Sequence, residues 1–377
     1  MKKILCYRYL AVFMRRNFIQ IYYISEVEKM KSILLNHETN DFRYYKANLH
    51  CHSTVSDGSK TPEQIKEDYK KHGYSIVAYT DHDAFILHNE LTDDSFLALN
   101  GYEMEITEPK LLKFDMLRTC HMCFIAKEPD HDITACYHRT KYFFSNAVQY
   151  RDSVHYDENL KDYERSYHPD CISEMMRIGR EKGFFVTYNH PYWSLEHYPE
   201  YSRYENMNAM EIVNYGCAVG GYDDDNGHCY EDLIRGGRQI YCIATDDNHN
   251  QHSDEDPKCD SYGGFVMIGA NQLKYHSIIE ALEKGSFFSS TGDYKNVGPM
   301  FRYLEYEDGK VRVETSDVKE IALLTNSRAC RSVHAAEGDS ITEAEFPIKQ
   351  DEKWFRLVIR DKRGYKAYTN AYFTEKM

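Results

Sequence analysis

The chain has 377 residues, 42% of them hydrophobic, and a formal net charge of −14. This length allows about two domains with an ample core, and the composition is that of a globular protein. The acidic balance argues against a surface that grips a long nucleic acid, which needs Lys and Arg, so bound divalent metals are the expected source of local positive charge.

The first 44 residues are expected to be an N-terminal extension. Arg15 and Arg16 interrupt its apolar run, and no stretch of about 20 apolar residues occurs, so neither export nor membrane insertion is expected. Met30 opens a second possible start, and we expect residues 1–29 to lie outside the fold. The 11 cysteines form no disulfide framework, which predicts reduced thiols and a cytoplasmic location.

A strand–helix–strand unit opens the main domain, which we assign to residues 45–292. A short apolar strand runs into HisCysHis at 50–52, and a helix is expected over 61–73, with Thr61 as its N-cap. The apolar run at 75–80 then predicts a strand buried on both faces. This order is typical of a parallel βαβ unit.

The same alternation continues with less regularity to the end of the main domain. Seven or so parallel strands with helices outside predict an α/β barrel. The expected strands are 97–105, 121–126, 184–189, 209–214 and 240–245, and the expected helices are 172–183, 228–236 and 275–285.

Two further segments depart from this pattern. Residues 127–168 have no sustained periodicity, and a connection of that length is typical of a lid, a binding loop or a poorly ordered insertion. After a linker-like passage at 290–299, short alternating strands and an AspGly turn at 308–309 predict a small antiparallel β domain. We assign it to residues 296–377 and expect it to resemble a β-sandwich.

Residues of metal-ligand type follow nearly every expected barrel strand, at the end where such folds build their sites. His50 and His52 are two apart on a strand and therefore share one face. Each histidine alone could be a packed core residue, but burying so many titratable groups together costs several kcal/mol unless metals or pairing compensate. The set therefore favours a metal site, and its members are His50, His52, Asp57, His82, Glu103, His121, His190, Asp247 and His249.

These motifs resemble those of the PHP (polymerase and histidinol phosphatase) superfamily. The resemblance covers residues 45–292 and rests on HisCysHis with a downstream AspGly, ThrAspHisAsp, Gly-x-Glu, HisPro and a closing Asp-x-His. It implies a distorted (β/α)7 barrel with a trinuclear site that holds up to three divalent metals, for which Zn, Mn or Fe suits the ligands. The implied ligand sets are His50, His52, Glu103 and Asp247; Glu103, His121 and His190; and Asp57, His82 and His249.

Four aspartates near the expected site differ in the roles that the sequence predicts for them. The Asp-x-His spacing favours Asp247 over Asp246 as the ligand. Asp81 is a candidate catalytic residue, although Asp81 and Asp83 are better suited to orienting histidines than to binding a metal. Cys51 stands between the two histidines of the first motif. It points to the opposite face of the strand and is expected in the core.

The leading hypothesis for function is hydrolysis of a small phosphate ester or nucleotide by metal-bound hydroxide. Arg118, Lys60 and Arg235 are candidates to hold phosphate, or else surface charges. The C-terminal layout resembles the carbaryl-hydrolase-like branch of the superfamily, whose diverse substrates keep open the hydrolysis of a carboxyl ester, amide or carbamate. Action on DNA ranks third, and a non-catalytic, metal-retaining binding module is the alternative from another class.

Overall fold

The computed structural model describes residues 10–15, 18–23, 31–109, 117–222, 225–328 and 331–377, with the backbone alone in the first two ranges. The predicted exclusion of residues 1–29 from the fold falls largely outside the described residues. The helices are α1 (Pro62–Lys71), α2 (Pro169–Glu181), α3 (Tyr198–Tyr201), α4 (Tyr215–Val219), α5 (Gly227–Arg235) and α6 (Tyr275–Lys284), with 3-10 turns η1 (Asn89–Leu91), η2 (Ser145–Ser153) and η3 (Thr374–Lys376). The strands before residue 200 are β1 (Leu10–Arg15), β2 (Phe18–Tyr23), β3 (Ser32–Leu35), β4 (Arg43–Asn48), β5 (Ile76–Tyr79), β6 (Leu97–Thr107), β7 (Thr119–Ala126), β8 (Ile133–Thr134), β9 (His155–Tyr156) and β10 (Phe184–Tyr188). The later strands are β11 (Ala209–Asn214), β12 (Tyr241–Thr245), β13 (Gly264–Ala270), β14 (Phe287–Thr291), β15 (Phe301–Glu307), β16 (Lys310–Val318), β17 (Glu320–Thr325), β18 (Arg331–His334), β19 (Ile341–Pro347), β20 (Trp354–Arg360), β21 (Lys366–Thr369) and β22 (Tyr372–Phe373).

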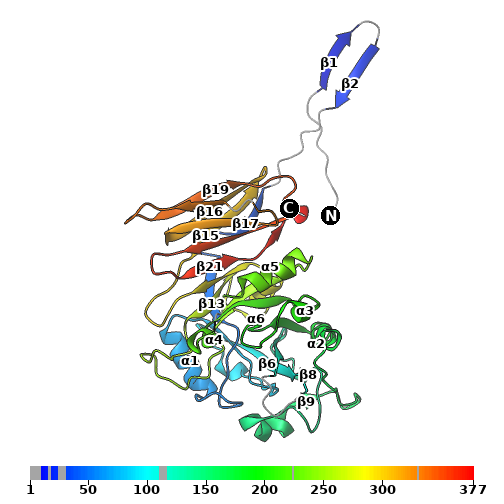
Figure 1. Cartoon of the computed structure of the whole chain (residues 1–377), viewed down its shortest axis with the longest axis vertical. Coiled ribbons are helices and arrows are strands. Elements are labelled where there is room, and N and C mark those ends of the chain that lie inside the picture. The colour runs from blue at the N-terminus through cyan, green and yellow to red at the C-terminus, as the bar shows by residue number, and fades with distance from the viewer. Residues whose placement is uncertain (1–9, 16–17, 24–30, 110–116, 223–224, 329–330) are drawn as a thin grey trace.

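The fold is mixed α/β and is built on one large sheet (Figure 1). Among the described residues this sheet has 14 strands in the order β12-β11-β10-β7-β6-β5-β4-β13-β14-β21-β20-β17-β18, with β22 beside β20. The strands and helices expected in the main domain are present, with ends shifted by a few residues, whereas β13 and most of β14 were not predicted.

The predicted all-parallel arrangement is wrong at β7. The pairs β4–β5, β5–β6, β10–β11 and β11–β12 are parallel, but β7 runs antiparallel to both β6 and β10. The physical reason is that β6 and β7 are consecutive strands that pair with each other from Thr107 and Thr119 onward, and only about a dozen residues separate them, which suits antiparallel pairing.

The large sheet does not close into the predicted barrel, since β12 ends the strand order among the described residues. The loop that follows the edge strand β12 nevertheless contacts the loop that follows β4. Beyond the strand ends, the Asp247 amide donates to the His50 carbonyl (3.0 Å) and the His52 amide donates to the Asn248 carbonyl (3.1 Å). The loops after β4 and β12 are thereby held together, and both carry candidate ligands.

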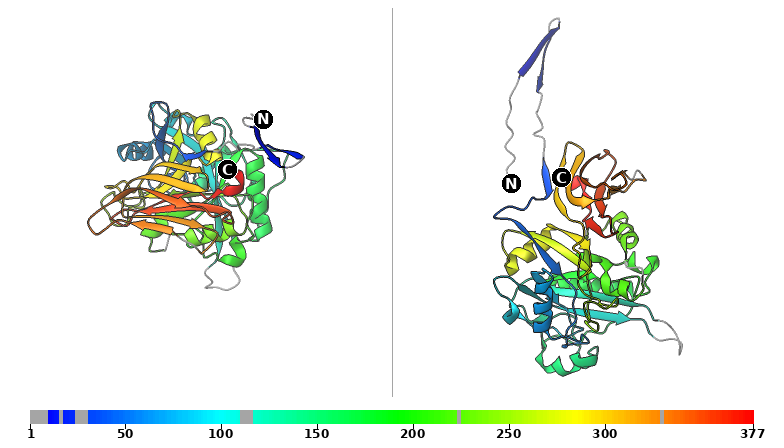
Figure 2. Two further views of the ribbon diagram at one scale, coloured as in Figure 1. Left: turned by 90° about the horizontal axis from the view of Figure 1, so that it is seen from above. Right: turned by 90° about the vertical axis from the view of Figure 1, so that its left-hand side faces the viewer.

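The C-terminal strands are divided between two sheets. β15, β16 and β19 form a four-stranded sheet with β3 of the N-terminal extension, while the remaining C-terminal strands continue the large sheet through the β14–β21 pair. These strands gather at one end of the molecule, away from α1 and α2 (Figure 2). The expected sandwich-like domain is therefore not a separate hydrogen-bonded unit.

Local sequence signals explain the ends of several elements. Thr61 caps α1 by accepting from the Gln64 amide, and the Gln64 side chain accepts from the Thr61 amide, which forms a capping box. Asp308 and Gly309 both have positive φ (52° and 74°), the conformation that the two central residues of a tight hairpin turn require.

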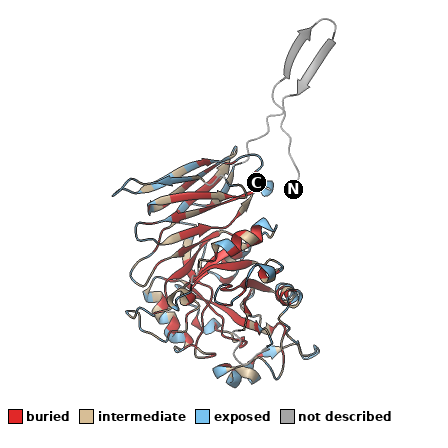
Figure 3. Cartoon of the chain, viewed as in Figure 1, coloured by how far each residue is buried: buried red, intermediate tan, exposed pale blue. Residues whose placement is uncertain are grey.

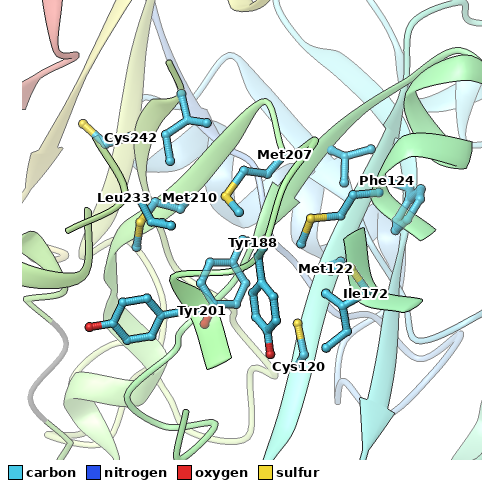
Figure 4. Close-up of a cluster of buried hydrophobic side chains, with 14 of the residues drawn as sticks. Cys120, Met122, Phe124, Ile172, Tyr188, Tyr201, Met207, Met210, Leu233 and Cys242 are labelled. Carbon is cyan, nitrogen blue, oxygen red and sulfur yellow. The ribbon is translucent and has the colours of Figure 1, made fainter. Parts of the chain in front are cut away.

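Many of the buried residues lie on the strands of the large sheet (Figure 3). One cluster lies between the outer faces of β7, β10, β11 and β12 and the helices α2 and α5 (Figure 4), where Tyr188, Met210 and Leu233 are almost completely buried. Close packing against α2 and α5 holds these strands in place, and therefore also fixes the positions of the polar residues at their carboxyl ends. None of the described helices is long and apolar enough to cross a membrane.

Candidate metal centre

The loop after β4 places the first two histidines side by side. His50 and His52 are both fully buried, and their Nε2 atoms lie 3.1 Å apart. Cys51 between them points into an apolar cluster, as expected from strand alternation. The pair therefore presents two ring nitrogens to one small space.

Glu103, near the middle of β6, is the centre of the site. Its side chain is 1% exposed, and Asn189 donates to its Oε1 at 2.8 Å. Burial opposes ionisation, yet the imidazoles around it hold the pKa of Glu103 well below its ordinary value. Five histidine nitrogens lie 3.2–3.5 Å from its two oxygens: His50 Nε2, His121 Nδ1 and His190 Nε2 around Oε1, and His52 Nε2 and His82 Nδ1 around Oε2.

Asp247 completes the inner part of the site. Its Oδ1 lies 3.1 Å from His50 Nε2 and 3.0 Å from His52 Nε2, and its backbone has a positive φ of 51°. Asp246 turns the other way, where its carboxylate accepts from the amides of residues 262–264 and from the Tyr69 hydroxyl. The structure thus places Asp247 in the site and Asp246 in a structural network behind it.

Asp57, His82 and His249 form the more open side of the site. Asp57 Oδ2 lies 3.7 Å from His82 Nε2 and 3.5 Å from His249 Nε2, and the side chains of Asp57 and His249 are 29% and 28% exposed. The His52 ring stacks against both histidine rings, with centroids 4.4 Å apart in each case. This side is where a molecule from solvent can reach the cluster.

The structure brings all nine predicted ligand residues together. Among the described residues, four overlapping groups have ligand atoms within 4.8 Å of one another, and they differ in detail from the sets implied by the resemblance. His52 joins the open group, and His190 groups with His50 and Asp247. The four groups are His52, Asp57, His82 and His249; His50, His190 and Asp247; His50, His52 and Glu103; and His82, Glu103 and His121.

The donor atoms fit cations. Ligands that share one cation at about 2.0–2.2 Å lie about 3.0–3.5 Å from each other, and most separations around Glu103 and Asp247 fall in that range. Three buried ligand atoms have no hydrogen-bond partner among the described residues: His82 Nδ1, His121 Nδ1 and Asp247 Oδ1. Buried polar atoms are rarely left unsatisfied, so these three atoms fit a role as ligands that would hold a cation.

One supporting carboxylate was not predicted. Glu211, in β11, accepts from His50 Nδ1 (2.7 Å) and Thr245 Oγ1 (2.6 Å) with one oxygen, and from the His190 amide (2.9 Å) with the other. It is fully buried and fixes both histidines. A glutamate inside the otherwise apolar AlaMetGluIleValAsn strand was the signal that could have revealed it.

The other predicted side chains lie around the site. Asp81 accepts from the amides and hydroxyls of Ser53 and Ser56 and does not line the cavity, so it braces the loop that carries His52 and Asp57. Asp83 is paired with Arg165. The three proposed phosphate holders also lie outside the cavity lining and are paired with acids: Arg118 with Glu108 and Glu200, Lys60 with Asp68, and Arg235 with Glu231.

A cavity of about 340 Å³ opens over the cluster. The 127–168 insertion reaches one wall, where the Phe144 ring lies 4.7 Å from the His82 ring and the Asn146 amide donates to the Ser56 carbonyl. Trp193 forms another wall, with its ring 5.4 Å from His121 and 5.0 Å from His190. The lining residues are Asp57, His82, Glu103, Glu105, His121, Phe144, His190, Trp193, Gly216, Cys217, Gly220, Tyr222, Asp247, His249 and Asp260.

No protein-family model and no curated protein matches this chain. Solved structures similar to it include a two-domain protein from Bacteroides vulgatus described as containing a predicted PHP-like metal-dependent phosphoesterase, with 15% identity and a TM-score of 0.42 over 90% of this chain and 98% of that one. Another is an amidohydrolase from Chromobacterium violaceum with bound sulfate and no metal, with 15% identity and a TM-score of 0.31 over 56% of this chain and 93% of that one.

Proposed function

We propose that this protein is a metal-dependent hydrolase that cleaves a small phosphate ester, with up to three divalent cations, Zn, Mn or Fe, held by the nine clustered residues. The observation that carries the proposal is the buried Glu103 carboxylate with five histidine nitrogens at 3.2–3.5 Å and unpartnered ligand atoms beside it. The motif resemblance to the PHP superfamily supports the same chemistry.

Divalent cations bound there would supply Lewis acidity, which lowers the pKa of water and neutralises phosphate oxygens. The chain's own residues prepare this site. Glu211 keeps His50 in one orientation, and His82, whose pKa is lowered to about 3 by burial and by His52, stays neutral and able to donate its lone pair. Phe144 and Trp193 shield the cluster from bulk water on two sides.

A second candidate reaction is hydrolysis of a carboxyl ester, amide or carbamate at the same site. One observation favours it, because phosphoryl-transfer sites commonly add Arg or Lys to the metals, and the described residues that line this cavity include neither. The size of the cavity, about 340 Å³, suits a small molecule in either case. No disulfide joins the described cysteines, and the cytoplasmic location expected from the sequence stays a proposal.

The deciding experiment measures metal content and hydrolysis on the same protein. Elemental analysis of the purified protein should find bound divalent metal, and a substrate panel should show turnover of phosphomonoesters or nucleotides. His190→Ala should lower both metal content and activity, whereas His276→Ala, at an exposed histidine outside the site, should change neither. Turnover of amides or carboxyl esters without any phosphoester would transfer the proposal to the second reaction, and unchanged metal content in His190→Ala would refute the site.

A further inference from the structure

The cavity wall beyond the clustered ligands combines aromatic rings with acids. Glu105 and Asp260 bring carboxylates to the wall, and Trp193 and Phe144 bring rings, while Lys and Arg are absent from its described lining. Glu105 follows Glu103 by two residues on β6 and is 36% exposed, with Oε2 at 3.6 Å from His121 Nε2. Asp260 accepts a hydrogen bond of 2.7 Å from the His249 amide.

The net charge of the cavity limits the number of negative charges that a bound substrate can carry. The ligand carboxylates of Asp57, Glu103 and Asp247 contribute three negative charges, so two or three divalent cations would leave a surplus of one to three positive charges. A single phosphate monoester dianion brings this sum to between −1 and +1, and the carboxylates of Glu105 and Asp260 then make the cavity negative in either case. Glu105 and Asp260 then face any second anionic group on the substrate without a compensating cation, and like charges in a partly desolvated cavity repel each other strongly.

The aromatic residues indicate what the rest of the substrate is. Trp193 is 38% exposed although its ring makes T-shaped contacts with His121 and His190, so part of this side chain remains accessible beside the cluster. Phe144 borders the His82 side of the same cavity. A planar group that leaves the cluster along this wall can stack on an aromatic ring, which gives affinity without charge.

We propose that the substrates are monoesters with one phosphate group on a planar organic part that carries no negative charge. Glu105 is the residue that rejects a second anionic group, and Trp193 packs against the planar part. This inference rests on the proposed phosphoesterase function, and it predicts that nucleoside di- and triphosphates and nucleic acid are poor substrates.

Matched aryl phosphates test the role of Glu105. At pH 8, kcat/KM for phenyl phosphate should exceed that for 4-carboxyphenyl phosphate by about tenfold, which corresponds to one like-charge contact across the cavity. Glu105→Gln should reduce this ratio to about threefold or less without loss of bound metal. Glu128→Gln, at a carboxylate that is 59% exposed and outside the cavity lining, should leave the ratio unchanged. Equal rates for the two esters, a ratio unaffected by Glu105→Gln, or loss of metal in that variant would overturn the proposal.

Fluorescence gives a readout that does not depend on turnover. The chain has 2 tryptophans, and Trp354 is 2% exposed, so Trp354→Phe leaves Trp193 as the reporter. Phenylphosphonate should change the emission of this variant at lower concentration than methylphosphonate or 4-carboxyphenylphosphonate does. Equal responses to the three ligands would overturn the proposal. If aryl carboxyl esters but no phosphates were hydrolysed, the function would be wrong, whereas preference for the uncharged ring would still uphold the roles of Trp193 and Glu105.

Discussion

At the scale of single residues, the candidate centre depends on side chains that are not ligands themselves but hold the candidate ligands in position. Glu211 fixes the ring of His50 and the backbone at His190, and each of its oxygens has at least two donors. A histidine ligand whose second nitrogen is held by a carboxylate has one tautomer and one orientation, which raises its affinity for metal.

Replacing this carboxylate should weaken metal binding. Glu211→Ala is expected to lower metal affinity by about 10–100-fold, because His50 loses its orienting acceptor. Competition with a coloured chelator measures this change directly. Glu90→Ala, at a glutamate that is 65% exposed, is the matched control and should bind metal as the wild-type protein does. Unchanged affinity in Glu211→Ala would contradict the role assigned to Glu211.

Most of the ligand-type residues could be collected from the sequence because they stand just beyond apolar strands. Glu103, within β6, and His121, near the start of β7, are exceptions that the motif resemblance helped to identify. Glu211 and Asn189 were missed for the opposite reason: they lie within or directly beside apolar strands, where a single polar residue looks like a solvent-facing position. How the nine residues divide among ions also could not be predicted, since it depends on distances between loops that are far apart in the chain.

Glu196 is a buried carboxylate in the loop that connects His190 to α3. Its oxygens accept from the hydroxyls of Tyr188 (2.6 Å), Tyr167 (2.9 Å) and Tyr204. Burial nevertheless raises its pKa from 4.5 to about 7, against the effect of these hydrogen bonds. The native state therefore binds this proton more tightly than the unfolded state does.

This raised pKa predicts a pH-dependent stability. The stabilisation is fully present below pH about 4.5 and is lost as the pH rises through about 7, with a total on the order of 3 kcal/mol. Glu196→Gln cannot ionise, so the stability of the wild-type protein minus that of the variant should fall between pH 5 and pH 8. Urea unfolding of both proteins at the two pH values measures this difference, and a constant difference would show that Glu196 does not titrate in this range.

At the scale of elements, a buried ion pair attaches the 127–168 insertion to the segment that follows His82. Arg165 is 4% exposed and pairs with the equally buried Asp83, and its Nη1 also donates to the Glu105 carbonyl at 2.8 Å. Asp83 directly follows His82, so the insertion is tied to the segment that carries a candidate ligand. The insertion is therefore attached beside the site and lines part of the cavity with Phe144, and its role as a binding loop stays a prediction.

Removing this anchor should loosen the insertion. Arg165→Met leaves Asp83 buried without a counter-ion, which is expected to destabilise the protein by about 3–5 kcal/mol and to expose residues 139–161 to protease. The double variant Arg165→Met with Asp83→Asn should recover part of that loss. Urea unfolding and limited proteolysis measure the two effects, with Arg177→Met on the exposed face of α2 as control. Equal stability of wild type and Arg165→Met would rule out the anchor.

The elements themselves were largely predictable, because capping residues and apolar periodicity act locally. Thr61 and Pro62 mark the start of α1, and Gly285 (φ 69°) marks the end of α6. Strand direction and partner choice were not predictable in the same way. The β3–β15 and β4–β13 pairs depend on contacts between segments that are far apart in the sequence.

At the scale of the whole molecule, the C-terminal strands are bound to the part that carries the site. β14 pairs with β21, and Arg356 on β20 forms an ion pair at 2.7 Å with Glu231 on α5, with both side chains largely buried. An apolar cluster also spans the two sheets. Such an interface favours unfolding as one unit.

The 2 tryptophans test this cooperativity, since Trp193 lies at the cavity and Trp354 on β20. Trp193→Phe and Trp354→Phe each leave one reporter in one part of the molecule. If the parts unfold together, urea transitions followed by fluorescence in each variant should coincide with the loss of helical circular dichroism in the same variant. A fluorescence transition displaced from the circular dichroism transition would show that the C-terminal strands unfold separately.

The pairing of β3 with β15 also sets the order in which the chain can fold during synthesis. Residues 32–35 are synthesised well before their partner strand, which begins at Phe301. In the same way, β4 is synthesised well before β13, which begins at residue 264. Contacts so distant along the chain slow folding and leave early strands unpaired in the meantime. The edges of β3 and β4 that these partners cover therefore stay unpaired until residues 264–307 have been translated.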